Sequence, residues 1–289
     1  MFDILLSKYG FFDDNYTLIE KGYQGEDKMS PKQFIVMGII FVLIVICSIL
    51  LRKTKKEKLF RIYKILAIFM PIFEIIKITY SSYFDIIHDA GFNWGGILPF
   101  YTCSMLLYFL PFVAFGKGKM QRYSMAFFST VGIIAGLSNF IYLSSAGFYP
   151  IFTYGCLYSI IFHAVLVFVG FSLLITGTYK PSIKTIFEGM VPVVLFSIPA
   201  TIVNFIVREI PNNGFVDYMM LMDFNGFIPQ ITGFFKEHHI VLLFSFLMVF
   251  VGYPIATAIM VFAEMGIAKL CALFKKDKKQ ERTLSNDTI

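Results

Sequence analysis

Charged residues are scarce in this sequence. Of its 289 residues, only 15% are Asp, Glu, Lys or Arg, while 57% are hydrophobic. Soluble domains are about one-quarter charged, and a water-soluble fold could not remove this much apolar side-chain surface from water. The scarcity of charge therefore excludes an ordinary soluble domain and indicates a protein embedded in a membrane.

Cysteine and histidine are scarce as well, with four of each. No CxxC pair and no zinc-type spacing of Cys and His occurs, so the sequence predicts neither a zinc site nor a disulfide framework. Nothing in it signals a nucleotide or haem, and we expect no metal or other cofactor. The chain begins with a mixed acidic stretch. A cleavable signal peptide begins basic and then turns apolar, so none is expected.

Long apolar runs are what the sequence has instead. Runs of about 18 residues or more can cross a hydrocarbon core roughly 30 Å thick. In lipid every backbone N–H and C=O must be paired internally, so spans are helices or closed barrels. Barrel strands would alternate in hydropathy, which these runs do not. We therefore predict an all-α integral membrane protein, a seven-transmembrane helix bundle. The predicted spans are 34–51, 62–80, 97–115, 123–143, 152–176, 186–207 and 240–270.

Basic side chains predict the orientation of these spans. They cluster after the first, third and fifth spans and in the C-terminal tail. Seven spans place all four clusters on one side, which is cytoplasmic by the positive-inside rule. The N-terminus is then outside and the C-terminus cytoplasmic. The same clusters account for the net charge of +6, so we expect no nucleic-acid partner.

Three regions of the chain follow from this pattern. Residues 1–33 form an extracytoplasmic N-terminal segment, residues 34–273 the transmembrane helical domain, and residues 274–289 a basic cytoplasmic tail. We expect a multi-pass protein of the cell membrane whose partners are membrane lipids. The sequence carries no signature of an oligomeric state.

Polar side chains recur at spacings of three and four within the spans, and such residues share a helix face. Polar groups inside a membrane are costly, so their placement is informative. These stripes could line a polar cleft open to the outer leaflet, or they could only form hydrogen bonds that hold the helices together. The stripes comprise Glu74, Lys77 and Ser81; Tyr101, Ser104 and Tyr108; Cys156, Ser159 and His163; and Ser197, Thr201, Asn204 and Arg208.

His163 is the one histidine within a predicted span. A neutral imidazole exchanges a proton near neutral pH, which suits a general base. The alternative is a buried histidine satisfied by a neighbour. Cys103 is a second reactive side chain, but in a regular helix it lies on an apolar strip opposite Tyr101 and Ser104. We therefore expect Cys103 to be inert.

Two short motifs resemble a known family. The run LPFYTCS at 98–104 resembles the LPLHLCS segment of the bacterial YwaF family of integral membrane proteins. The run DYMML at 217–221 is similar to that family's NYMFL, and His163 lies between the two motifs in the same order. The resemblance covers roughly residues 30–270. The YwaF family is in turn distantly similar to the eukaryotic transmembrane-protein-164 acyltransferases.

This resemblance implies the movement of fatty acyl chains between phospholipids, with a cysteine and histidines as catalytic groups. The chain departs from the pattern at three positions. Tyr101 replaces the histidine of span three, Gln33 replaces that of span one, and Phe100 occupies the position of the acyltransferase cysteine. His163 alone carries over, as a general base, and the nucleophile is unassigned.

We predict a cleft that acts on phospholipid acyl chains, with His163 as general base and Tyr101 and Asn204 as hydrogen-bond donors. A non-catalytic protein that binds a lipid or small molecule, or that assists transport, is the alternative. A transporter that depends on Glu74 is a third possibility. The residues predicted to contact substrate are Glu74, Ser104, Ser159, Asp217 and Tyr218.

Overall fold

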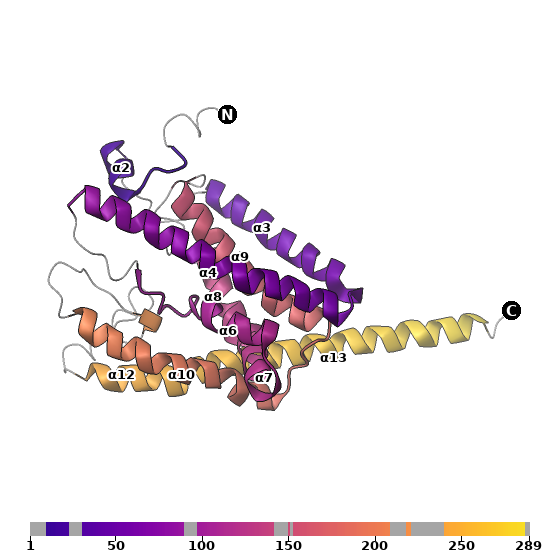
Figure 1. Cartoon of the computed structure of the whole chain (residues 1–289). Coiled ribbons are helices and arrows are strands. Elements are labelled where there is room, and N and C mark those ends of the chain that lie inside the picture. The colour runs from indigo at the N-terminus through magenta and orange to yellow at the C-terminus, as the bar shows by residue number, and fades with distance from the viewer. Residues whose placement is uncertain are drawn as a thin grey trace.

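Helices make up the regular structure of the described part of the chain (Figure 1). The computed structural model describes residues 10–22, 31–89, 97–141, 150, 153–208, 218–220 and 240–286. The α-helices are α2 (Asn15–Glu20), α3 (Pro31–Leu50), α4 (Lys56–Ile87), α6 (Met105–Phe115), α7 (Gly118–Phe127), α8 (Ile133–Ile141), α9 (Tyr154–Ile175), α10 (Ile183–Arg208), α12 (Val241–Leu247) and α13 (Tyr253–Asn286). Short 3₁₀ or π turns are η1 (Leu51–Lys53), η2 (Phe128–Gly132), η3 (Tyr218–Met220) and η4 (Met248–Gly252). The prediction of an all-α protein is confirmed.

Several of these helices are suited to lipid. Five helical segments in the described ranges are long and apolar enough to cross a membrane. They are Phe34–Lys53, Gly118–Phe140, Tyr154–Ile175, Ile183–Val207 and Val241–Lys269. Two of them are helices joined end to end through π turns, α7 with α8 and α12 with α13. The chain is thus an integral membrane protein.

The helices pack around one large hydrophobic core. This core joins α4, α6, α7, α9 and α10. A second, smaller cluster joins α3, α8 and α9, with Phe140 and Ile160 among its buried residues. Small residues permit the close approach of α8 and α9, because a Cβ on Gly136 would lie 2.4 Å from a methyl carbon of Val167. The α9 helix therefore contacts both clusters and is central to the bundle.

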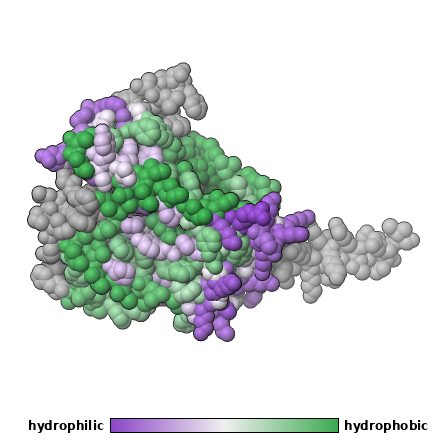
Figure 2. All heavy atoms as spheres, viewed as in Figure 1, coloured by the Kyte–Doolittle hydropathy of each residue, from purple (hydrophilic) through white to green (hydrophobic). Residues whose placement is uncertain are grey.

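The outer surface of the bundle is apolar. On α3, the side chains of Ile39, Val42 and Ile46 are exposed, and on α10 Ile198 and Ile202 are exposed. Figure 2 shows hydrophobic side chains over the middle of the visible face and hydrophilic ones towards its two ends. A surface of this kind is stable only against lipid, because water would make its exposure unfavourable.

Two contacts show which helix ends lie together. The hydroxyls of Tyr63, near the start of α4, and Ser172, near the end of α9, are 2.8 Å apart. Near the starts of α7 and α10, Arg122 donates to Glu188 at 2.9 Å. The basic segments that follow α3, α6 and α9 therefore gather at one end of the bundle. The α13 helix extends past the bundle at its C-terminal end (Figure 1), and the division into three regions stays a prediction.

The third predicted span begins as turns and not as a helix. Residues 98–104 precede α6, which begins at Met105. The Ser104 N–H donates to the Tyr101 carbonyl at 2.9 Å, a bond across a turn. Pro99 lacks an N–H and disfavours helical geometry in the residue before it, which is the physical reason that the helix starts later than 97.

Candidate functional site

A cavity of about 360 Å³ lies between α4, α9, residues 98–104 and the N-terminal segment. It reaches the end of α4 at Asp85 and the start of α9 at Tyr154. These helix termini lie at the end of the bundle opposite to the basic segments. The cavity extends inward as far as His163, about 14 Å along the α9 axis from Tyr154.

His163 is held in place by its own helix. Its Nδ1 lies 2.7 Å from the carbonyl oxygen of Ser159, one turn earlier. A carbonyl oxygen only accepts, so this contact favours the tautomer that carries its proton on Nδ1. The amide nitrogen of Asn139, on α8, lies 3.1 Å from the same Nδ1, a contact that favours the other tautomer, and it donates to the Ser159 hydroxyl at 3.3 Å. The imidazole is therefore held at a cavity wall by a backbone carbonyl and a side-chain amide.

Glu74 forms a charged pair in the opposite wall, on α4. One carboxylate oxygen accepts from Lys77 at 3.0 Å, and the other accepts from the Tyr158 hydroxyl. The Lys77 ammonium also lies 5.6 Å from the centre of the Tyr158 ring, a cation–π distance. Glu74 is 5% exposed, so these contacts offset much of the cost of burying its charge.

Cys103 lines the same cavity as Tyr101 and Ser104. The expectation that it lies on the opposite side of the span is wrong. That expectation assumed a regular helix, whereas residues 98–104 form turns, and a turn brings neighbouring side chains to one side. The cavity wall thus contains a thiol, a buried serine hydroxyl and a tyrosine.

Asn204 and Tyr218 lie behind the cavity and do not line it. The Asn204 amide donates to the Tyr218 carbonyl at 3.0 Å and accepts from the Tyr218 N–H at 2.8 Å. The Tyr218 ring packs edge-on against Tyr101, with ring centres 5.0 Å apart. The next residue, Met219, has a φ of 57°, a left-handed conformation that is unfavourable outside glycine. Asn204 therefore positions Tyr218, which in turn supports Tyr101. Asp217 lies outside the described residues.

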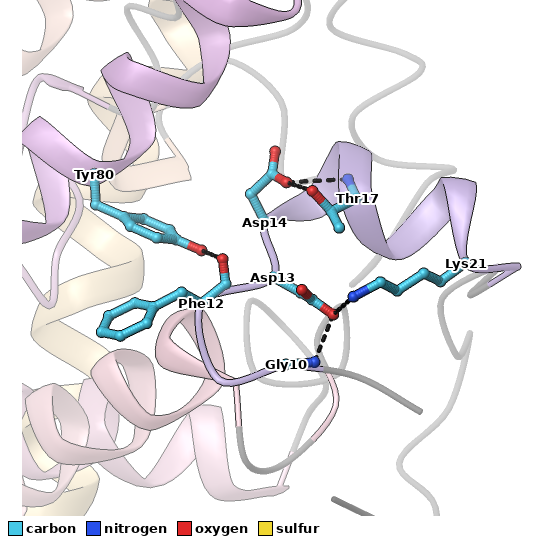
Figure 3. Close-up of polar contacts among 7 residues, drawn as sticks. All are labelled: Gly10, Phe12, Asp13, Asp14, Thr17, Lys21 and Tyr80. Carbon is cyan, nitrogen blue, oxygen red and sulfur yellow. Dashed lines mark hydrogen bonds and ion pairs between the residues drawn. The ribbon is translucent and has the colours of Figure 1, made fainter. Parts of the chain in front are cut away.

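The N-terminal segment is attached to the mouth of the cavity by backbone contacts. The hydroxyl of Tyr80, on α4, donates to the Phe12 carbonyl at 2.8 Å (Figure 3). The backbone N–H of Tyr154, at the start of α9, donates to the Phe11 carbonyl at 2.7 Å. Residues 10–22 therefore form part of the outer wall of the cavity, a role that the sequence did not suggest.

The carboxylates of Asp14 and Asp85 both line the outer end of the cavity. Asp14 caps α2 by accepting from the Thr17 N–H at 3.0 Å, as Figure 3 shows. Asp85 is 6% exposed, and its Oδ1 accepts from the Tyr16 hydroxyl at 3.2 Å. Burial raises the pKa of Asp85 and the nearby Asp14 adds to that rise, while the Tyr16 hydrogen bond opposes it.

The structure brings five of the eight predicted site residues to one cavity. These are Glu74, Tyr101, Ser104, Ser159 and His163. Sequence reasoning missed several lining residues, namely Cys103, Asp14, Tyr16, Asp85, Tyr154 and Tyr158. The two tyrosines of α9 could have been found as an aromatic stripe, because Tyr154, Tyr158 and Phe162 are spaced four apart on one helix face.

The cavity combines a base, hydroxyl and thiol groups, and an ion pair beneath a lipid-facing surface. That set of groups can move a proton and stabilise developing charge. No cluster of three or more His, Cys, Asp or Glu side chains suited to a metal ion occurs within the described ranges.

Comparison with known proteins gives one match. The model of the TMEM164 family matches residues 28–256, which includes every lining residue from Glu74 to His163. Comparisons with curated proteins and with solved structures gave no match. The matched segment covers most of the chain, and the chain therefore belongs to the TMEM164 family.

Proposed function

We propose that this protein crosses the cell membrane seven times, with its N-terminus outside. The seven proposed spans are the five long apolar segments together with α4 and α6. The charged residues of α4 face the cavity at Glu74 and Lys77, which explains how a helix with few uninterrupted apolar residues can span lipid. The gathering of basic segments at one end supports the orientation, because Lys and Arg remain in the cytoplasm.

The proposed activity is the transfer of a fatty acyl chain between membrane phospholipids, in the outward-facing cavity. The observation that carries it is the imidazole of His163, held by the Ser159 carbonyl at the wall of a cavity that also holds Cys103 and Ser104. Membership of the TMEM164 family supports a membrane function, and the resemblance drawn from the motifs supports acyl chains as the substrate.

In the proposed transfer, His163 accepts a proton from the acceptor lipid and returns it to the leaving group. The hydroxyl of a lysophospholipid attacks the ester carbonyl of a donor phospholipid, and the neutral imidazole accepts its proton. The tetrahedral intermediate then collapses, breaking the donor ester bond, and the imidazolium returns the proton to the departing oxygen. A route through a Cys103 thioester uses the same proton transfers in two successive steps.

The test uses purified protein in lipid nanodiscs that contain a phospholipid with a labelled acyl chain and a lysophospholipid acceptor. Mass spectrometry follows the label from donor to acceptor. We expect transfer by the wild type and its loss in His163→Ala. Cys103→Ala and Ser104→Ala identify the nucleophile, because only a covalent route requires one of them.

Cys156→Ala is the matched control. Cys156 is on the same helix as His163, but it packs in the smaller hydrophobic cluster with Met37 and Phe140 and does not line the cavity. Its replacement should leave the transfer rate within about twofold of the wild type, because its side chain does not line the cavity in which transfer is proposed. Equal transfer by His163→Ala and the wild type would contradict the proposal.

A non-catalytic lipid-binding protein is the second candidate, and Tyr101 is the observation in its favour. Tyr101 stands where the family resemblance implies a histidine, and it lines the cavity supported by Tyr218. A defined ratio of bound phospholipid that survives detergent, with no transfer of label, would support this function over acyl transfer.

A further inference from the structure

A second cavity, of about 280 Å³, lies at the end of the bundle where the basic segments gather. Arg122 lines it from α7, and Lys180 lines it from the segment that follows α9. None of its described lining residues is acidic. A hollow with two cations in its walls has a positive potential and is suited to an anion.

The guanidinium of Arg122 is oriented by a fixed carboxylate. Its Nε donates to Glu188, on α10, at 2.9 Å. The same Glu188 oxygen lies 3.3 Å from the hydroxyl of Tyr179, a residue that is 8% exposed and also lines the cavity. Because the contact with Glu188 uses Nε, the guanidinium keeps further N–H donors in a planar fork that fits two oxygens of a phosphate group.

The positive charge of Lys180 is not neutralised within the described part of the chain. Lys180 is exposed and takes part in none of the ion pairs found there. Gly118 lines the cavity at the start of α7, where no described side chain caps the helix. The N–H groups of that first turn add partial positive charge. After the pair of Arg122 with Glu188 is counted, the cavity therefore keeps a net positive charge.

Apolar surface flanks this cavity. It lies where the candidate span Gly118–Phe140 begins and Tyr154–Ile175 ends, which is the level of lipid headgroups in a membrane. Phe187, the residue before Glu188, is 73% exposed, and Ile183, at the start of α10, is 59% exposed. An anion with attached acyl chains suits this position, because the chains can lie against such side chains.

We propose that this cavity binds the phosphate group of an anionic phospholipid. Arg122 contacts two phosphate oxygens, Lys180 neutralises the remaining charge, and the acyl chains lie along the exposed side of α10. Basic pockets between membrane helices are suited to anionic headgroups in this way. The site is at the opposite end of the bundle from the mouth of the His163 cavity, and it does not depend on acyl transfer.

The experiment measures binding and not turnover. Detergent-purified protein is titrated with dihexanoyl phosphatidic acid, dihexanoyl phosphatidylglycerol and dihexanoyl phosphatidylcholine, and Kd is measured by microscale thermophoresis. We expect the two anionic lipids to bind about tenfold more tightly than the choline lipid, the size of one charge-assisted contact. Equal Kd values for the three lipids would overturn the proposal.

Variants assign the preference to the cavity. Lys180→Gln removes an exposed charge and should lower the preference to about threefold, half of the tenfold effect in free energy. Arg122→Gln combined with Glu188→Gln removes both members of the ion pair, leaves the net charge unchanged and should lower the preference by a similar factor. An unaltered preference in both proteins would contradict the site.

Lys58→Gln is the matched control. Lys58 is exposed near the start of α4, at the same end of the bundle, and it does not line the cavity. Its replacement removes the same charge as Lys180→Gln and should leave the tenfold preference intact. A loss equal to that of Lys180→Gln would show that the preference comes from the net charge of this end, which would refute a defined site.

Further titrations separate a lipid from a soluble source of phosphate. Inorganic phosphate and glycerol phosphate should bind at least about tenfold more weakly than phosphatidic acid, since they lack acyl chains. Inorganic phosphate that binds as tightly as phosphatidic acid would make this a soluble-phosphate site and refute a lipid ligand. His163→Ala should keep the preference for anionic lipids, so a failure of acyl transfer leaves this result unaffected.

Discussion

The Nδ1 atom of His163 lies 2.7 Å from the backbone carbonyl oxygen of Ser159, one turn earlier in α9. Because the acceptor is a backbone oxygen, most substitutions at Ser159 would preserve this contact. It fixes the orientation of the imidazole at the wall of the cavity. The helix itself thus orients the group that the proposed chemistry depends on.

The buried ion pair on α4 should matter more for stability than the exposed pair near the N-terminus. Lys77→Met leaves the Glu74 carboxylate with the Tyr158 hydroxyl alone, and we expect a loss of about 3 kcal/mol or more in the free energy of unfolding. Lys21→Met removes an exposed partner of Asp13 and should cost about 1 kcal/mol or less. Denaturation in detergent measures both, and equal losses would show that the α4 pair is not buried.

Asn204 should act on stability through the backbone of Tyr218. Asn204→Ala leaves one buried N–H and one buried carbonyl of Tyr218 without their partner, at an expected cost of about 2–5 kcal/mol. Ser197→Ala, on the same helix, loses only a bond to the carbonyl of Val194 and should cost less than about 1 kcal/mol. A stable Asn204→Ala protein that lacks acyl transfer would instead assign Asn204 a direct role in chemistry.

The charge of Asp85 should make the apo protein less stable as pH rises. Burial raises the pKa of Asp85 in the folded protein, so the folded state binds its proton more tightly than the unfolded state does. This contribution to stability is fully present below the ordinary aspartate pKa and is lost as pH rises through the higher folded value. In Asp85→Asn the contribution is absent. The unfolding midpoint of the wild type should therefore fall relative to that of the variant over this pH range. A constant difference between them would exclude a raised pKa.

The proposed orientation makes a direct prediction about labelling in intact cells. In a variant without the native cysteines, a membrane-impermeant maleimide added outside should label Glu20→Cys on the N-terminal segment. It should label Lys55→Cys, between η1 and α4, only after the cells are opened, because basic segments stay in the cytoplasm. The reverse labelling pattern would show that the N-terminus is cytoplasmic and would contradict the proposed orientation.

Runs of apolar residues were sufficient to predict the helical membrane fold, because lipid allows little else for such runs. The spacing rule also placed Ser159 and His163 on one face of α9, where the structure has them. The rule worked there because α9 is a regular helix from Tyr154 to Ile175. In a regular helix, the spacing of two residues in the sequence determines whether their side chains lie on the same face.

The rule failed where the chain is irregular or where a partner is distant in sequence. Cys103 was assigned to the wrong side because residues 98–104 turn before α6 begins. Asn204 bonds to the backbone of Tyr218. Helix periodicity predicts which face of α10 carries Asn204, but it does not predict which segment packs against that face. The contribution of Tyr16 to the cavity depends on Asp85, which is remote in sequence.

The most direct test of the central claim compares transfer with binding in the same nanodiscs. For wild type and His163→Ala, the initial rate of labelled acyl transfer is divided by the amount of phospholipid bound to the protein. Loss of a general base should lower this ratio by about 10²–10⁴-fold while bound lipid is unchanged. A ratio that is the same in the two proteins would show that His163 is not the base.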